Sequence, residues 1–304
     1  MISLHQLRTF VEVVSCGSVR AASERLVVSQ PAVSAALAAL AREIGTPLFE
    51  REGRGLRLTE GGRTMERYAR RILALIDEGT HQARVAAEMG AGCLRLGAVT
   101  TVAEHVLPEL LRGFRAAHGD VVIELQVANR VSIWKLLENW EVDLVLGGRP
   151  PGREGFKTLA TRPNELAVVA RPGSGAKGIE DLARETWLLR EPGSGTRVTT
   201  EEFFDSLGIA PPRLTIGSNG AIREGVLCGL GIALLARDAV RRELAEGTLE
   251  VVATPATPLE RAWHLVAAAD RDLSPTAQGF VAHLLAVGEF VADEARDAGN
   301  ASVT

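Results

Sequence analysis

The chain has 304 residues, of which 46% are hydrophobic and 24% are charged, and it contains three cysteines. This composition is typical of a globular protein of two or three domains and excludes a disordered chain or a small disulfide-stapled one. No stretch approaches 18 apolar residues, and the opening MISLHQLRTFVEVV lacks the pattern of a signal peptide, so we expect a cytoplasmic protein without a membrane span.

Charge is unevenly distributed along the chain. The net charge of −4 argues against a protein coated in nucleic acid. Residues 1–91, however, hold twelve arginines against ten acidic residues, which gives +2 there and leaves −6 for the remainder. If the protein binds nucleic acid, the N-terminal part is therefore expected to bind it.

The first 45 residues predict three helices. Apolar residues recur at helical spacing over residues 4–14, and Gly17 is expected to end that helix. Ser18 and Ser29 are expected N-caps of a short second helix and a longer third one, with a turn at Val27 between them. This arrangement predicts a helix-turn-helix, although the spacing alone also permits a generic three-helix core.

The next segment, LFEREGRGLRLTEGG, predicts a hairpin beside the third helix. LFER and LRLT are short strand patterns around a glycine-containing turn, which is typical of a wing. Arg51, Arg54 and Arg57 lie on this hairpin. Such arginines are often only a solvated edge, but beside a helix-turn-helix we expect them to contact phosphates or the minor groove.

The stretch from HQLRTF to LTEGG resembles the DNA-binding end of the LysR-type transcriptional regulators. About sixty residues match without a gap, including SQPAVS and LFER. The resemblance implies that Ser29, Gln30, Pro31 and Ser34 begin the recognition helix and that Arg51 is the wing arginine. Gln30 can bond bidentately to adenine, and Pro31 suits the first helical turn.

The predicted recognition helix departs from the family at three positions. Many members carry Gln, Arg or Lys where this chain has Ala35, Ala36 and Ala38. Alanine can contact thymine methyl groups, but each lost phosphate contact weakens binding. We therefore expect Ala35 to touch base methyl groups while the wing supplies much of the positive charge.

A long helix is predicted from the cap residue Thr59 to about Met89. Steps of four and three residues predict a coiled-coil seam, formed by Met65, Ala69, Ile72, Ile76, Gly79, Ala83 and Ala86. A helix packed only on its own core is the alternative, but about 45 Å of helix exceeds what one winged domain covers. The resemblance implies dimerisation here, hence a homodimer or a tetramer on a pseudo-palindromic operator.

Beyond Gly92 the pattern changes to strands and helices in alternation, which predicts an α/β domain of two lobes, each a parallel sheet wrapped by helices. This part resembles the family's effector-binding domain, itself similar to type 2 periplasmic solute-binding proteins. The expected divisions are a winged helix-turn-helix over residues 1–58, a linker helix over 59–90 and an effector-binding domain over 91–304. Lobe I is expected at about 91–160 and 268–295, and lobe II at about 161–267.

A ligand site is expected between the lobes, at the carboxyl ends of strands. The residues there offer hydroxyls, amides, free N–H groups and arginines, and they are Thr100, Thr101, Asn129, Arg130, Gly148, Ser194, Gly195, Thr196, Arg197 and Asn219. Each alone is more often a cap or turn residue, but together they suit a carboxylate, sulfate or phosphate. Two roles stay open: His105 either lines the cleft or lies on the surface, and Arg197 either holds the ligand or braces its loop.

The loop REPGSGTR, residues 190–197, does not indicate an enzyme. It lacks the lysine of a P-loop, and the six histidines form no catalytic or metal pattern. We expect no metal and no cofactor. A transport solute-binding protein would need a signal peptide and no helix-turn-helix. The sequence therefore favours a LysR-type regulator of transcription that binds operator DNA and a small anionic metabolite, with RNA polymerase as a further partner. The loop is similar to that of regulators of sulfur assimilation and carbon fixation.

Overall fold

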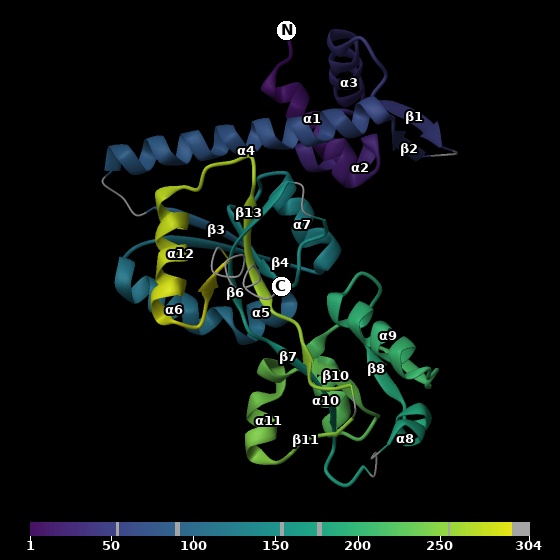
Figure 1. The fold of residues 1–304 in the computed structure, drawn as a ribbon. Coiled ribbons are helices and arrows are strands. Elements are labelled where there is room, and N and C mark those ends of the chain that lie inside the picture. The colour runs from purple at the N-terminus through teal and green to yellow at the C-terminus, as the bar shows by residue number, and fades with distance from the viewer. Residues whose placement is uncertain (53–54, 89–91, 153–154, 175–177, 255, 294–304) are drawn as a thin grey trace, which may run out of the picture. The chain divides into compact units, whose positions relative to one another are not determined.

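The computed structural model describes residues 1–52, 55–88, 92–152, 155–174, 178–254 and 256–293 (Figure 1). The chain forms two compact units, one of residues 1–90 with 138–141 and the other of residues 91–137 with 142–304. We call them the winged unit and the effector unit. None of the helices in the described ranges is both long enough and apolar enough to cross a membrane.

The winged unit contains the predicted helix-turn-helix and wing. Its elements are α1 (Leu4–Cys16), α2 (Val19–Leu26), α3 (Gln30–Ile44), the antiparallel strands β1 (Phe49–Glu52) and β2 (Gly55–Leu58), and α4 (Glu60–Glu88). The predicted caps are confirmed, because the Ser18 and Ser29 hydroxyls accept from the N–H groups of Ala21 and Ala32. Phe10 is fully buried in the core of this unit, with its ring 5.4 Å from that of Phe49.

The turn between α2 and α3 holds a residue in an unfavourable conformation. Val27 ends α2 with φ = 55°, in the left-handed region, and its N–H donates to the Glu24 carbonyl. Its side chain is 89% exposed, so packing does not compensate for the conformation. A β-branched residue at positive φ is rare because its Cβ substituents crowd the backbone.

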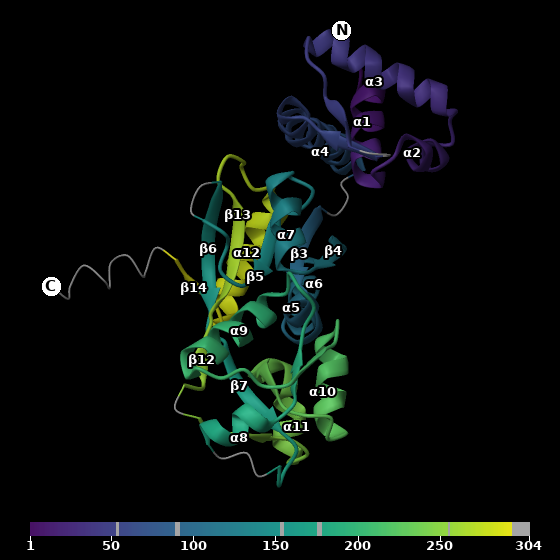
Figure 2. The same ribbon diagram turned by 90° about the vertical axis from the view of Figure 1, so that its right-hand side faces the viewer.

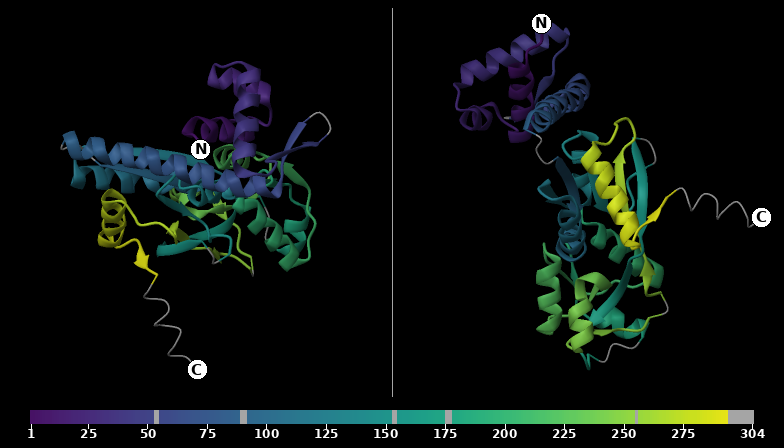
Figure 3. Two further views of the ribbon diagram at one scale, coloured as in Figure 1. Left: turned by 90° about the horizontal axis from the view of Figure 1, so that it is seen from above. Right: turned by 90° about the vertical axis from the view of Figure 1, so that its left-hand side faces the viewer.

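Helix α4 begins as predicted, but its exposed apolar side chains coincide with the predicted seam only at Ile72 among the described residues. The Thr59 hydroxyl accepts from the Gly62 N–H at 2.9 Å, as expected of a cap. Ala69 of the predicted seam is buried in the core of the winged unit, and Met65 packs against that core. The large exposed apolar side chains are Tyr68, Ile72 and Leu75, spaced by four and three residues. We call these three residues the α4 stripe; Figure 3 shows α4 as one uninterrupted helix.

Lobe I of the effector unit is built on a six-stranded sheet in the order β14-β6-β13-β5-β3-β4. Its strands are β3 (Cys93–Val99), β4 (Val122–Ala128), β5 (Leu144–Gly147), β6 (Phe156–Arg162), β13 (Trp263–Ala268) and β14 (Val291–Ala292). Only β3, β4 and β5 run parallel, as the strand-helix alternation predicted. Its helices are α5 (Thr100–His105), α6 (Leu107–His118), α7 (Arg130–Glu138) and α12 (Pro275–Val287).

The two faces of this sheet are covered by different helices (Figure 1). Leu94, Leu96 and Ala98 of β3 share one core with residues of α5, α6 and α12. On the opposite face, a Cβ at Gly97 would lie 3.0 Å from the Ile133 side chain of α7. The short helix α5 was not predicted, because its six residues are too few for a periodic pattern. It places Thr100 and Thr101 in a helical turn at the end of β3.

Lobe II is built on a second, four-stranded sheet. Here β10 (Ala233–Ala236), β11 (Glu250–Val251) and β12 (Leu259–Glu260) all pair antiparallel with β7 (Glu165–Ala170), while β8 (Trp187–Leu189) and β9 (Arg213–Thr215) form a parallel pair. The surrounding helices are α8 (Ile179–Arg184), α9 (Gly195–Leu207), α10 (Asn219–Leu227), the 3-10 helix η1 (Arg237–Val240) and α11 (Arg241–Glu246). The prediction of a second all-parallel unit is wrong for β7, because this strand enters the lobe as a crossing segment and runs against its neighbours.

Two chain segments join the lobes (Figure 2), and the second crosses earlier than predicted. Strand β13 was expected largely in lobe II, yet it pairs with β5 and β6 of lobe I, so the crossing lies between β12 and β13. The crossings are tied together by two hydrogen bonds. Asn164 Nδ2 donates to the Arg261 carbonyl and the Arg261 N–H donates to the Asn164 carbonyl, both at 2.8 Å.

We predict that Val27→Asn stabilises the winged unit. Asparagine tolerates the left-handed conformation better than a β-branched residue does, so the free energy of unfolding should rise by about 1 kcal/mol. Val28→Asn is the matched control, since the neighbouring valine has no positive φ, and it should bring no comparable gain. Scanning calorimetry of the full chain checks both; equal effects of the two substitutions would contradict the prediction.

Candidate functional site

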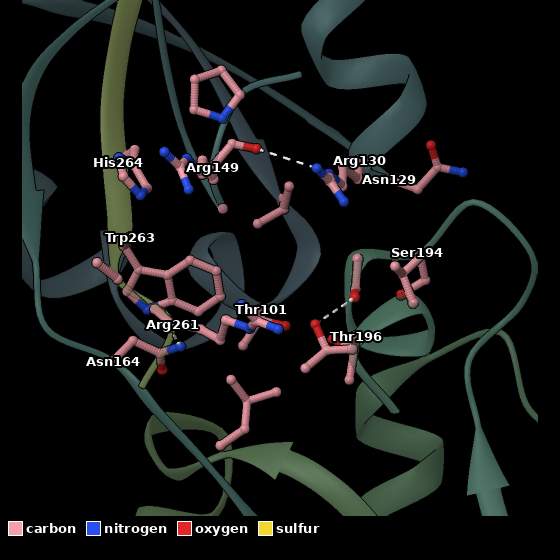
Figure 4. A pocket seen from close by; sticks show the side chains of 18 of the residues that line it. Thr101, Asn129, Arg130, Arg149, Asn164, Ser194, Thr196, Arg261, Trp263 and His264 are labelled. Atoms are coloured by element: carbon pink, nitrogen blue, oxygen red, sulfur yellow. Dashed lines mark hydrogen bonds between the residues drawn. The ribbon is translucent and has the colours of Figure 1, made fainter. Parts of the chain in front are cut away.

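A cavity of about 810 Å³ lies between the two lobes of the effector unit (Figure 4). Eight of the ten residues predicted for a ligand site line it: Thr100, Thr101, Asn129, Arg130, Gly148, Ser194, Gly195 and Thr196. In Figure 4, Ser194 and Thr196 face the cavity from one side, while Trp263 and Asn164 lie on the other. The two lobes therefore contribute polar groups to one shared space.

The start of α9 supplies hydrogen-bond donors to this space. The first N–H groups of any α-helix have no partner within the helix. Ser194 is the N-cap of α9, but its side chain makes no capping hydrogen bond, so it does not take up these N–H groups. Gly193, with φ = 91°, lets the loop turn, and a Cβ at Gly195 would lie 3.4 Å from Cδ of Arg130. The glycines thus bring uncapped N–H groups of lobe II close to α7 of lobe I, an arrangement that favours an anion.

The arginines that line the cavity fall into two groups. Arg190 and Arg261 are neutralised by carboxylates, Arg190 by Glu191 at 2.8 Å and Arg261 by Glu202 at 2.7 Å. Arg130 donates to the Arg149 carbonyl at 3.5 Å, and neither Arg130 nor Arg149 has a carboxylate partner within the described ranges. The lining arginines without a carboxylate partner among the described residues are therefore on lobe I, after the carboxyl ends of β4 and β5, in a cavity whose wall also includes Glu260 and Asp293.

Asn219 does not line the cavity, contrary to prediction, and neither does Arg197, whose role the sequence left open between holding the ligand and bracing its loop. The Arg197 guanidinium donates to the Arg190 carbonyl at 3.0 Å and to Glu201 at 2.9 Å, so it braces the loop 190–197 from behind. Asn219 is 3% exposed and donates to the Thr101 hydroxyl instead of facing the cavity. Both residues follow strands, which is why a ligand contact was considered for them. The hydrogen bonds of Arg197 go to its own helix and loop, and that of Asn219 goes to the other lobe.

His105 also lies away from the cavity. It sits at the end of α5, with Nε2 3.6 Å from a Glu104 oxygen, and burial lowers the pKa of its imidazole. Of the two locations that the sequence left open, the structure therefore does not support the cleft, and the side chain is 19% exposed. Among the residues in the described ranges, no group of three or more His, Cys, Asp or Glu side chains is placed to hold a metal ion.

Sequence reasoning missed the cavity residues that come from the crossings, Asn164, Arg261 and Trp263. They stand at the junction of strands that belong to different sheets, and no motif marks such a junction. The available signal was the polar break TRPNE between two strand patterns. Asn164 Oδ1 and Trp263 Nε1 are buried without hydrogen-bond partners among the described residues. One acceptor and one donor therefore remain without a partner among the described residues on this side of the cavity.

The residues predicted for DNA contact lie together on the surface of the winged unit. Ser29, Gln30, Pro31, Ser34 and Ala35 are all exposed at the start of α3. Arg57 on the wing is exposed and pairs with Glu50 at 2.7 Å. Arg54 and the side chain of Arg51 are outside the described residues.

Both units match models of one protein family. Residues 4–63 match the model described as bacterial regulatory helix-turn-helix protein, lysR family, and residues 87–289 match the LysR substrate binding domain. The chain belongs to the LysR family. It is a LysR-type transcriptional regulator with a DNA-binding and an effector-binding part, and the comparisons favour this function over a solute-binding protein or an enzyme of similar fold.

The chain is similar to two named transcriptional regulators and to one solved regulatory domain. The regulator is 35% identical to the HTH-type transcriptional regulator CfxR of Cupriavidus necator, over 93% of this chain and 91% of that one. It is 35% identical to the RuBisCO operon transcriptional regulator of Allochromatium vinosum, over 97% of each chain. The solved regulatory domain of CcmR from Synechocystis PCC6803, in complex with 2-PG, is 31% identical with a TM-score of 0.60, over 64% of this chain and 97% of that domain.

We predict that Glu191→Gln destabilises the regulator most at neutral pH. The substitution removes the counter-charge of Arg190, which is 5% exposed, at a cost of about 1–3 kcal/mol. Hydrogen bonds from Arg190 lower the pKa of Glu191, so the pair contributes fully above the ordinary glutamate pKa of about 4.3 and is lost as pH falls through the lowered value. Melting temperatures between pH 7 and pH 3 should converge in acid; a constant gap would contradict this.

Proposed function

We propose that a small anionic metabolite, bound in the cavity between the lobes, controls the binding of this regulator to operator DNA. The proposal rests on Arg130 and Arg149, which have no carboxylate partner among the residues that the structure describes, together with the uncapped N–H groups at the start of α9. Arginine forks and helix N-termini both favour phosphate and carboxylate groups. The 31% identical CcmR domain in complex with 2-PG, a small anion, supports the same ligand class.

We propose that residues of both lobes bind the anion at the same time. Thr100 and Arg130 would hold it from lobe I, and Ser194, Gly195 and Thr196 from lobe II. Asn129 and Gly148 would shape the wall between them. A ligand that makes bonds to both lobes has its highest affinity for the arrangement that brings them together, so its binding shifts the population toward that arrangement.

On the DNA side we propose direct contacts by the start of α3 and by the wing. Gln30 would bond to a base edge, Ser29, Pro31 and Ser34 would lie against the backbone or groove, and Ala35 would contact a methyl group. Arg57, together with Arg51 and Arg54, would supply phosphate contacts. The exposure of all five α3 residues supports this assignment. The corresponding divisions are residues 1–58 for DNA binding, 59–90 for the linker and 91–304 for the effector domain.

We infer that the regulator assembles as a homodimer, or as a tetramer of two dimers, through the linker helix and the effector domain. The α4 stripe supports the first contact, because three large apolar side chains at coiled-coil spacing are exposed. Strand β4 supports the second, because it is an edge strand with Val122, Leu125 and Val127 exposed. Such a dimer would meet a pseudo-palindromic operator in the cytoplasm, where RNA polymerase would be its further partner.

We predict that Gln30→Ala weakens operator binding by about ten-fold or more, the loss expected when one bidentate base contact disappears. Arg57→Gln should instead lower the slope of log affinity against log salt by about one, because it removes one phosphate contact. Fluorescence anisotropy with a duplex selected from a random pool by the unaltered protein checks both. Gln278→Ala, an exposed glutamine on α12, is the control. Unchanged affinity of the Gln30 variant would contradict the assignment.

We predict that Thr100→Val or Thr196→Val abolishes the response to 2-PG while binding to the same duplex in its absence persists. Each substitution removes one hydroxyl from the cavity with little change in side-chain volume. Thr215→Val, an exposed position on β9 of lobe II, should respond like the unaltered protein. Footprinting with and without 2-PG provides the measurement. Lost DNA binding, or a retained response in both cavity variants, would refute the ligand site.

A further inference from the structure

A buried hydrogen bond links the lobes directly behind the cavity. Asn219 is the first residue of α10 in lobe II, and Thr101 is the second residue of α5 in lobe I. Asn219 Nδ2 donates to Thr101 Oγ1 at 2.5 Å, and the two residues are 3% and 6% exposed. Thr101 lines the cavity and Asn219 does not. The bond to Thr101 therefore connects Asn219 to a residue that lines the cavity.

The chemistry of the hydroxyl decides what this contact does. A threonine hydroxyl has one hydrogen to donate and two lone pairs that accept. Because the Asn219 N–H points at the Thr101 oxygen, the hydroxyl hydrogen points elsewhere, and within the described ranges no acceptor receives it. An anion in the cavity offers only acceptors. The contact with Asn219 thus leaves Thr101 ready to donate to an anion.

The same bond joins residues of different lobes. It forms only in arrangements that bring the start of α10 against the start of α5. A second link between the lobes, Arg162 of β6 with Asp238 of η1 at 2.7 Å, does not reach the cavity; Arg162 also pairs with Glu289 of lobe I at 2.9 Å. Of these two contacts, the Thr101–Asn219 bond is therefore the one that joins the arrangement of the lobes to a residue that lines the cavity.

We propose that Asn219 is a positioning residue: it fixes the Thr101 hydroxyl as a donor toward the bound anion and so couples anion affinity to the arrangement of the lobes. This inference rests on the proposed function of the cavity. It gives Asn219 a role different from direct ligand contact. The Asn219 side-chain oxygen Oδ1 is buried without a hydrogen-bond partner among the described residues, so the bond to Thr101 is the one that the side chain makes with them.

A double-mutant cycle on the full chain tests the proposal, with 2-PG and inorganic phosphate as probes in isothermal titration calorimetry. Asn219→Leu and Thr101→Val should each weaken binding by about ten-fold or more, as expected when one hydrogen bond to a charged group is lost. The double variant should bind no more weakly than Thr101→Val alone, because Asn219 acts only through that hydroxyl. Thr101→Ser keeps the hydroxyl and should keep the sensitivity to Asn219→Leu.

Two further variants provide a substitute for Asn219→Leu and a control for the stability of α10. Asn219→Ser, whose side chain is too short to reach Thr101, replaces the leucine variant if that one does not fold as judged by circular dichroism. Ser218→Ala removes the N-cap of α10 but leaves the Asn219 amide, so it should lower the melting temperature without changing probe affinity.

Different results would contradict the role of Asn219 and the proposed anion site. Additive losses in the double variant would show that Asn219 acts independently of Thr101, and unchanged or tighter binding by the Asn219 variants would show that it does not prepare a donor. Either result overturns the inference and leaves the anion site standing. Failure of the unaltered protein to bind either probe would overturn the proposed ligand class, and the inference with it.

Discussion

The effector unit depends on the place where its chain crosses twice between the lobes. Asn164 and Arg261, one from each crossing, exchange two hydrogen bonds of 2.8 Å, which hold the crossings side by side. Because β6 and β13 belong to one sheet while β7 and β12 belong to the other, this pair lies at the joint around which the lobes meet. The cavity lies beside that joint and is lined by both of these residues. Small rotations there change the distance between groups on opposite walls.

The N-terminal ends of two helices, α3 and α9, lie at the two proposed binding sites of this regulator. In the winged unit Ser29 caps α3 and exposes its first turn, where DNA contact is proposed. In the effector unit the start of α9 is left without a side-chain cap, and its N–H groups remain available beside Arg130. Satisfying a helix start strengthens the helix, whereas leaving it open prepares a place for an anion. The difference follows from whether a serine hydroxyl bonds to its own helix.

The sequence predicted those features that local hydrogen bonding and periodicity determine. Ser18, Ser29 and Thr59 cap their helices, and the wing pairs as expected. Two of the failures concern partners that are distant along the chain. Met65 and Ala69 have coiled-coil spacing but pack into the winged core, and the position of Asn219 after a strand did not reveal that Thr101 would take up its hydrogen bond. Only the folded arrangement of the helices and lobes determines such choices.

Trp263 places a fluorescent side chain in the wall of the cavity. Its indole forms part of the wall at the second crossing, and its ring nitrogen is buried without a partner among the described residues. Indole emission depends on local polarity and on nearby charge, so an anion entering this space alters the surroundings of a chromophore that the chain already carries. Occupancy and movement at the joint can thus be followed by the protein's own fluorescence, without a label that would itself disturb the crossings.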